Sequence, residues 1–113
     1  MVKGKVVLLP FPFNDFSSLK VRPAVCLTDP VGQHRQVVVA FITSKVPADL
    51  LDTDLLIPID HPDFAGTGLR VTSTIRLHRL MTVDIAFIKR ELGELSPALT
   101  NEVTVWLRRL FVL

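Results

Sequence analysis

Short hydrophobic runs, separated by turn-forming residues, dominate the first 95 positions of the chain and predict β-strands. The runs are rich in Val, Ile, Leu and Phe and are bounded by Gly, Pro, Asp, Asn or Ser. The longest run alternates apolar and polar residues until Leu80-Met81, where the alternation slips and predicts a β-bulge. We expect strands at Lys5–Leu9, Arg22–Thr28, Gln36–Ile42, Leu55–Ile59, Thr72–Val83 and Phe87–Leu92.

Three connections between these runs carry signals of their own. The segment Phe11–Val21 holds Pro, Asn, Asp and Ser, which favour a loop that leaves the sheet. The segment Val46–Leu51 has a Pro at an early position and predicts one helical turn. We expect a loop at His61–Gly68.

The C-terminal segment has the periodicity of an α-helix. Ser96 is the expected N-cap and Pro97 the first helical residue. One face of this helix carries Leu99, Val103, Trp106, Leu107 and Leu110. Five or six short strands closed by one helix predict a mainly β domain over residues 1–113, built as a strongly bent sheet or partial barrel.

The composition fits one globular domain. The chain has 113 residues, of which 49% are hydrophobic and 21% charged. No run of about 18 apolar residues predicts a membrane span. The N-terminal stretch is too short and too interrupted by Pro10 for a signal peptide. We therefore expect a soluble cytoplasmic protein without membrane contact.

Charge is nearly balanced overall but uneven along the chain. The net charge is +2, with six Lys and Arg against two Asp in residues 1–48. Residues 49–63 hold five Asp and no Lys or Arg, and residues 64–113 hold seven Lys and Arg against four acids. Two basic blocks around an acidic loop permit a basic patch on the folded surface.

Several kinds of chemistry lack the residues that they need. The single cysteine, Cys26, excludes a disulfide framework and a cysteine-based zinc site, and its mid-strand position is typical of a small buried hydrophobe. The three histidines are far apart in the sequence and lack paired spacing, so we expect no metal site. Motifs of serine hydrolases, dinucleotide-binding proteins and P-loop NTPases are absent from the sequence.

Polar residues at the ends of two strands are the strongest functional signal in the residues themselves. If the strands that hold Arg22 and Thr43 are antiparallel neighbours, these two residues and Ser44 lie at the same end, beside the Phe13–Lys20 loop. A guanidinium, two hydroxyls and aromatic rings suit a phosphodiester of single-stranded nucleic acid. Structural alternatives stay open: an exposed cation or a salt bridge to Asp15 at position 22, and hydroxyls that cap the turn at Pro47.

The chain also resembles the MazF/PemK family of toxins. The resemblance is carried by Gly4-Lys5-Val6-Val7-Leu8-Leu9-Pro10-Phe11-Pro12-Phe13, by Arg22-Pro23-Ala24-Val25, by Ala40-Phe41-Ile42-Thr43-Ser44 and by Ser73 to Leu80 with Ile88-Lys89-Arg90 and Gly93 to Ser96. It implies a small SH3-like barrel of five to seven strands with a C-terminal helix, usually a homodimer. It also implies an endoribonuclease that cuts single-stranded RNA, such as mRNA, without metal or cofactor, and a cognate antitoxin that blocks the RNA groove.

The same resemblance assigns candidate site residues. Arg22 and Thr43 would be the catalytic pair, with Ser44 beside them. Ser44 and the loop residues Ser17, Ser18 and Lys20 would help to hold RNA. The residues themselves add Lys45, Arg76 and Arg79 as phosphate contacts, Phe13 and Phe16 as stacking rings or packing residues, and His78 as a proton carrier or a half-buried strand residue. Many members of the family carry an Asp-Gln pair where this sequence has Ser73-Thr74, so we expect a different cleavage specificity.

Both the function of the chain and the packing of its C-terminal residues keep an alternative. In place of a nuclease, the chain could be a binding module, or a toxin that binds a protein target as gyrase poisons do. The C-terminal residues 106–113 include six apolar residues out of eight, and this surplus predicts packing either on a second subunit or back onto the domain itself.

Overall fold

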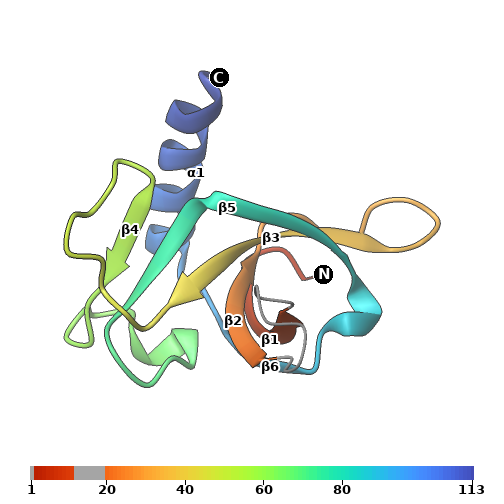
Figure 1. The fold of residues 1–113 in the computed structure, drawn as a ribbon, viewed down its shortest axis with the longest axis horizontal. Helices are drawn as coiled ribbons and strands as arrows, with labels where there is room; N and C mark the ends of the chain where they lie inside the picture. Colours follow the sequence, from red (N-terminus) through yellow and green to blue (C-terminus); the bar gives the residue numbers. More distant parts are fainter. Residues whose placement is uncertain (1, 12–19) are drawn as a thin grey trace.

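The structure, a computed structural model, describes residues 2–11 and 20–113. Its described residues form a curled, six-stranded antiparallel sheet with the strand order β4-β5-β3-β2-β1-β6, and a C-terminal helix stands at one side of it (Figure 1). The strands are β1 (Lys5–Phe11), β2 (Lys20–Cys26), β3 (Gln36–Thr43), β4 (Asp54–Ile57), β5 (Ser73–Asp84) and β6 (Arg90–Glu94), and the helix is α1 (Pro97–Phe111). The mainly β fold with a C-terminal helix is therefore confirmed.

Strands β1 and β2 reach further than predicted, into the segment expected to be a loop. Pro10 pairs with Val21, and Phe11 pairs with Lys20. Proline is tolerated here because the pairing of β1 with β6 ends at Leu8, and no strand among the described residues pairs with that edge of β1 beyond it. The rest of the predicted loop, residues 12–19, lies outside the described residues.

The helical turn predicted at Val46–Leu51 is wrong. This segment is a series of bends, and the Leu51 N–H donates to Asp54 Oδ2 at 3.0 Å instead of to a helical carbonyl. One turn of helix makes too few hydrogen bonds to offset the cost of ordering it. Because the Asp54 carboxylate takes this N–H, the segment is joined directly to the start of β4.

The last strand begins three residues later than predicted. Residues Ile85–Phe87 form a 3₁₀ turn, η2, which begins where the Asp84 side chain accepts a hydrogen bond from the Ala86 N–H at 2.9 Å. A second 3₁₀ turn, η1 (Ala65–Thr67), lies within the loop predicted at His61–Gly68. The side-chain cap at Asp84 delays the start of β6, and hydrophobic periodicity does not report such a cap; η1 begins without a side-chain cap.

A bulge interrupts β5 close to its predicted place. Ala40 of β3 pairs with Leu80, but the next residue, Phe41, pairs with Arg76, so residues 77–79 have no partner on β3. Side chains alternate strictly between the faces of a regular strand. Because the number of inserted residues is odd, side chains of β5 on one side of the bulge lie on the opposite face of the sheet from the one that regular pairing with β3 would give.

The curled sheet has a hydrophobic core on each face. One core packs the sheet against α1 and includes Val6, Val25, Ile42, Ile75, Leu77, Leu99 and Val103. The other core covers the opposite face and includes Val7, Leu9, Ala24, Val37, Val39 and Val83. The helix begins as predicted, because the Ser96 hydroxyl accepts from the Leu99 N–H at 3.2 Å and Pro97 follows it.

No helix in the described part of the chain is both long enough and apolar enough to span a bilayer.

Candidate functional site

Strands β2 and β3 are antiparallel neighbours, as the sequence analysis assumed. Their register pairs Ala24 with Phe41, and its continuation sets Arg22 opposite Thr43. Both residues line one pocket of about 150 Å³, which we call the Thr43 pocket. Its lining residues are Arg22, Phe41, Ile42, Thr43, Lys45, Arg76 and Arg79.

Among the described residues that line the Thr43 pocket, four are cationic and none is acidic. Arg22 comes from β2, Lys45 follows β3, and Arg76 and Arg79 come from β5. Residues three apart on a regular strand point to opposite faces, so the bulge at residues 77–79 is what allows Arg76 and Arg79 to line one pocket. Such a concentration of positive charge favours an anionic ligand.

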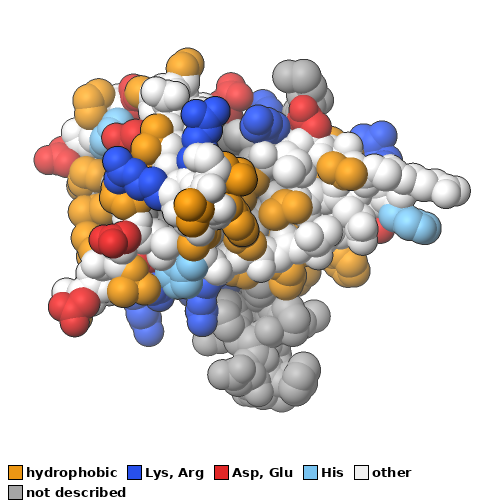
Figure 2. All heavy atoms as spheres, turned by 90° about the horizontal axis from the view of Figure 1, so that it is seen from above, with side chains coloured by type: hydrophobic (Ala, Val, Ile, Leu, Met, Phe, Trp, Pro, Cys, Tyr) orange, Lys and Arg blue, Asp and Glu red, His pale blue; other side chains and the backbone are white. Residues whose placement is uncertain are grey.

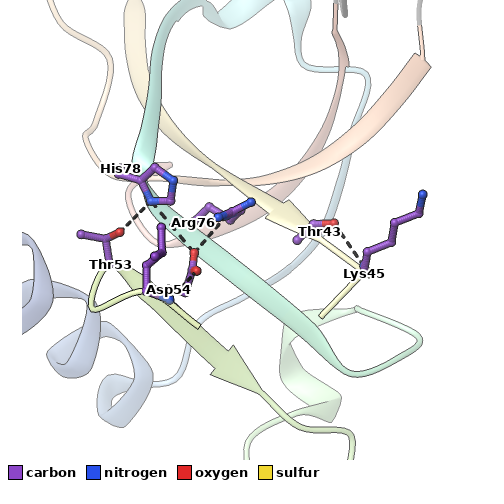
Figure 3. A network of polar contacts seen from close by, with 7 residues as sticks. Thr43, Lys45, Thr53, Asp54, Arg76 and His78 are labelled. Atoms are coloured by element: carbon purple, nitrogen blue, oxygen red, sulfur yellow. Dashed lines mark hydrogen bonds and ion pairs between the residues drawn. The ribbon is translucent and has the colours of Figure 1, made fainter. Parts of the chain in front are cut away.

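A buried carboxylate fixes the direction of Arg76. Asp54 pairs with Arg76 across β4 and β5, and its Oδ1 accepts from Arg76 Nε at 3.0 Å. The side chain of Asp54 is fully buried, whereas that of Arg76 is 24% exposed. In Figure 3 the guanidinium extends from this contact toward Thr43. Asp54 thus holds one edge of the guanidinium and leaves its terminal nitrogens for a ligand.

The hydroxyl of Thr43 is oriented by the backbone that follows β3. Its Oγ1 accepts a hydrogen bond from the Lys45 N–H at 3.1 Å (Figure 3). Within the described part of the chain, the hydroxyl hydrogen has no acceptor, so it can donate to an anionic oxygen in the pocket. The hydroxyl therefore caps the bend at Lys45, not a turn at Pro47 as the structural alternative held, and it lines the pocket together with the cations.

His78 does not line the Thr43 pocket. Its Nδ1 lies 2.7 Å from Thr53 Oγ1 and 4.0 Å from Asp54 Oδ1, on the far side of the Asp54 carboxylate from Thr43 (Figure 3). The strand therefore places His78 next to the ion pair of Asp54 and Arg76, rather than among the groups that surround the pocket.

Ser44 lines a second pocket of about 240 Å³, which we call the Arg90 pocket. Arg22 and Ile42 line both pockets, so the two adjoin each other at the end of β2 and β3. Arg70, Ser73 and Arg90 also line the Arg90 pocket. The predicted catalytic residues thus divide between two adjoining pockets, with Thr43 in one, Ser44 in the other and Arg22 in both.

The structure does not describe the side chains of four predicted RNA-binding residues. Phe13, Ser17 and Ser18 lie outside the described residues, and of Lys20 only the backbone is described, where it pairs with Phe11. Their roles stay predictions.

The Ser73-Thr74 pair, where the family resemblance pointed to a departure, lies at buried positions. Ser73 is 2% exposed and Thr74 is fully buried. The Ser73 hydroxyl donates to the Val71 carbonyl at 2.8 Å. Neither side chain is free to reach far from the sheet, so a direct contact of Thr74 with a base is excluded in this structure.

The sequence analysis did not select Asp54, Arg70 or Arg90 as site residues. Asp54 was counted only as part of the acidic stretch 49–63. A signal was nevertheless present, because an acidic residue directly before a predicted hydrophobic strand is placed beside the next strand once the two pair. Arg70 and Arg90 come from two segments whose proximity depends on how the η1 loop packs against β6.

Among the described residues, no group of three or more His, Cys, Asp and Glu side chains is arranged to hold a metal ion. The polar side-chain groups that the described residues place around the Thr43 pocket are cations and one hydroxyl.

Comparisons with solved structures identify the fold. The chain is similar to the Mycobacterium tuberculosis toxin MazF-mt6, with 22% identity over 96% of this chain and 97% of that one and a TM-score of 0.72. It is similar to an endoribonuclease from a mycobacterial species in complex with its cognate antitoxin, with 16% identity over 100% and 96% and a TM-score of 0.71. It is also similar to the MazE-MazF structure (Form-II) from Deinococcus radiodurans, with 17% identity over 97% and 94% and a TM-score of 0.72.

A search of curated proteins gives no match. A family model does match, over residues 2–111, and its description is the PemK-like, MazF-like toxin of type II toxin-antitoxin systems. The match spans every described strand and the helix, and it includes the residues that line both pockets. The chain therefore belongs to the PemK-like, MazF-like family of type II toxin–antitoxin toxins.

Proposed function

We propose that this toxin is an endoribonuclease that cleaves single-stranded RNA without a metal ion. One observation carries the proposal: four cations and the Thr43 hydroxyl surround a pocket that no acidic residue of the described ranges 2–11 and 20–113 lines. A pocket of this kind favours a phosphodiester, and the family to which the chain belongs includes toxins described as endoribonucleases.

The proposed reaction is an internal transfer. The 2′-hydroxyl of the ribose attacks the neighbouring phosphorus and expels the 5′-oxygen of the next nucleotide. The products are a 2′,3′-cyclic phosphate and a 5′-hydroxyl. DNA lacks the attacking group and is therefore not a substrate. Since the nucleophile is already tethered to its target, alignment by the pocket can supply much of the rate.

Arg22 and Arg76 are the proposed partners of the two non-bridging phosphate oxygens. Negative charge builds on these oxygens during the attack, and the loss of one preorganised donor of this kind typically costs about 3 kcal/mol. The Thr43 hydroxyl donates to the same phosphate and fixes the line of attack. Asp54 keeps the Arg76 guanidinium in place between turnovers.

Proton transfer needs a different group from these arginines. A guanidinium stays protonated near neutral pH and is therefore a poor base there. His78, the candidate from the sequence, does not line the Thr43 pocket, so we propose that it affects cleavage only through the ion pair that orients Arg76. A pH profile of cleavage by His78→Ala tests this assignment: an unchanged shape of the profile supports it, and the loss of one limb would show that His78 carries the proton.

The partner that we propose for the resting toxin is an antitoxin with an acidic segment over the Thr43 pocket. Solved relatives contain a toxin with its cognate antitoxin. The four cations that line the pocket would repel one another less when such a segment covers them.

The test is incubation of the purified protein with a long single-stranded RNA in EDTA. We expect fragments that end in a 2′,3′-cyclic phosphate and begin with a 5′-hydroxyl. Arg22→Ala and Thr43→Val should each slow cleavage about a hundredfold. Arg35→Ala, which removes an exposed cation at the other end of β3, is the matched control and should cleave like the wild type.

Two outcomes would contradict the proposal. Full activity of Arg22→Ala would exclude the assigned role of that residue. Intact RNA, together with growth arrest on expression of the protein, would favour the alternative class, a toxin that acts by binding a protein target.

A further inference from the structure

Two cations that line the Arg90 pocket, Arg70 and Arg90, have no role in the mechanism proposed above. Arg70 and Arg90 are exposed, and within the described part of the chain neither forms an ion pair. The acidic neighbours of Arg90 on β6 are occupied elsewhere, because Lys5 Nζ lies 2.9 Å from Glu91 and 3.6 Å from Glu94. The two guanidinium groups are therefore available to an anion.

The floor of this pocket is apolar. Leu8, Ile42 and Leu92 line the pocket together with the arginines, and we call these three side chains its floor. Ser44 adds a hydroxyl. An apolar surface beside planar guanidinium groups matches the two halves of a nucleotide, which has a flat base and a charged phosphate. A pocket that bound only free phosphate would not need the apolar floor.

The Arg90 pocket adjoins the Thr43 pocket through shared residues. Arg22 and Ile42 line both, while the consecutive residues Thr43 and Ser44 line one each. An RNA strand whose scissile phosphate lies between Arg22 and Thr43 therefore has the Arg90 pocket as its next position along the surface. Consecutive nucleotides would occupy consecutive pockets.

The wall of the Arg90 pocket is held by a close contact between backbones. Gly68 (φ +74°) lies against β6, where an added Cβ would come 2.1 Å from the Leu92 carbonyl oxygen. Gly93 lies against η1, where an added Cβ would come 2.3 Å from the Gly66 carbonyl oxygen. Only glycine permits this approach at both positions, and it fixes Arg70 relative to Arg90 before any ligand binds.

We propose that the Arg90 pocket binds the nucleotide next to the scissile phosphate of single-stranded RNA. Its base lies on the apolar floor, and its phosphate is held by Arg70 and Arg90. The proposal rests on the RNA substrate proposed above and adds the subsite that selects one flanking base.

The test compares two double variants that each remove two exposed cations. Arg70→Gln/Arg90→Gln changes the Arg90 pocket, and Arg35→Gln/Arg108→Gln lowers the net charge equally at positions that line neither proposed pocket. Binding of a 5′-labelled single-stranded RNA of mixed sequence is measured by fluorescence polarisation, with 2′-O-methyl groups in place of the 2′-hydroxyls so that the proposed attack cannot occur. Far-ultraviolet circular dichroism confirms that both variants are folded.

We expect the Kd of Arg70→Gln/Arg90→Gln to rise at least tenfold, and that of the control at most about twofold. The slope of log Kd against log salt should fall by about 0.7 for each phosphate that the variant no longer binds. In cleavage of a long RNA, KM should rise while kcat stays within about threefold, and the preference for one base flanking the cut should be relaxed. A merely structural role would not change that preference.

Equal effects of the two double variants, or an unchanged Kd in Arg70→Gln/Arg90→Gln, would overturn the subsite. If the wild type still cleaves RNA in that case, the proposed nuclease function stands without the subsite. Conversely, RNA binding that depends on Arg70 and Arg90, with no cleavage by the wild type, would support the subsite and overturn the nuclease.

Discussion

Asp54 is the residue that most directly fixes the direction of Arg76 in the Thr43 pocket. Its side chain is fully buried and accepts from Arg76 Nε at 3.0 Å and from the Leu51 N–H at 3.0 Å. Removing the charge from a buried hydrogen-bonded pair leaves its partner poorly satisfied. The carboxylate thus connects the stability of the fold to the geometry of the site.

Asp54→Asn keeps the size of the side chain but removes its charge. We expect the free energy of unfolding to fall by about 1–3 kcal/mol, because Arg76 is partly exposed and water can replace some of the missing interaction. RNA cleavage should show a lower kcat with a smaller change in KM, since Arg76 would lose its fixed direction. Urea denaturation and steady-state cleavage measure the two effects.

Asp52→Asn is the matched control for this substitution, because Asp52 is exposed and makes no ion pair within the described chain. It should leave both the unfolding free energy and kcat unchanged. A kcat of Asp54→Asn equal to that of the wild type would show that Arg76 does not need the carboxylate.

Cys26 illustrates how burial controls the chemistry of a single residue. It is 1% exposed, and burial, together with the charge of Glu91, raises the pKa of its thiol to about 11. Since thiolate is the reactive form, the native protein should hold about a hundredfold less of it at pH 7.5 than an ordinary cysteine would.

We therefore predict that Ellman's reagent reacts slowly with native Cys26 and fast after unfolding in urea. The burst of absorbance on unfolding should correspond to one thiol for each chain. Equal rates in native and unfolded protein would contradict the buried position.

At the scale of elements, the contact between η1 and β6 is the tightest constraint near the site. Gly93→Ala would place a Cβ 2.3 Å from the Gly66 carbonyl oxygen and 2.6 Å from the Thr67 carbonyl carbon. These are backbone atoms, so one of the two segments must move. We expect a loss of about 1–3 kcal/mol in unfolding free energy by thermal or urea denaturation.

Gly66→Ala in the same turn is the control, because its Cβ would meet only an ordinary contact of 3.9 Å with the Glu94 carbonyl oxygen. The predicted difference between the two substitutions comes from this contact alone. Equal stability of the two variants would show that the loop adapts without cost.

Elements with a strong periodic pattern could be predicted from the sequence, and elements set by local capping could not. The helix was predicted from Ser96, Pro97 and its apolar face, and β3 from its β-branched run. The start of β6 was missed because η2, with its cap at Asp84, comes first. A side chain that takes one backbone N–H decides such boundaries, and hydrophobic periodicity does not register it.

The same division holds for the candidate site. Arg22 and Thr43 follow from strand ends and antiparallel pairing, which the sequence predicts. The partnership of Asp54 and Arg76 depends on the register of β4 against β5, and the joint position of Arg76 and Arg79 depends on the bulge. Register and bulge arise from tertiary packing and leave only a weak signal in the sequence.

At the scale of the whole molecule, the end of α1 is poorly covered. Phe111 is 55% exposed, and Val112 and Leu113 are each 89% exposed. Figure 2 views the molecule from the side at which α1 ends and shows hydrophobic side chains interspersed with lysine and arginine side chains. Of the two packing alternatives for the C-terminal residues, this exposure favours a second subunit.

We predict that the protein sediments at low micromolar concentration with twice the 12.6 kDa mass of the chain. Phe111→Asp/Leu113→Asp should sediment as a single chain, because a carboxylate is costly to bury at an apolar interface. Val46→Asp, which alters an exposed hydrophobic residue of a different segment, is the control and should leave the mass unchanged. A wild type that sediments as a single chain would contradict the prediction.

The three unpaired residues of β5 also have a consequence for how members of this fold can diverge. The odd number of inserted residues determines which face of the sheet the side chains of each half of β5 point to. The loss of any one of residues 77–79 would therefore move the side chains of one half to the opposite face. The number of arginines that line the Thr43 pocket can therefore change through a length variation of a single codon, with no arginine substituted. Homologous chains that differ in length at this point should differ in how strongly they attract polyanions.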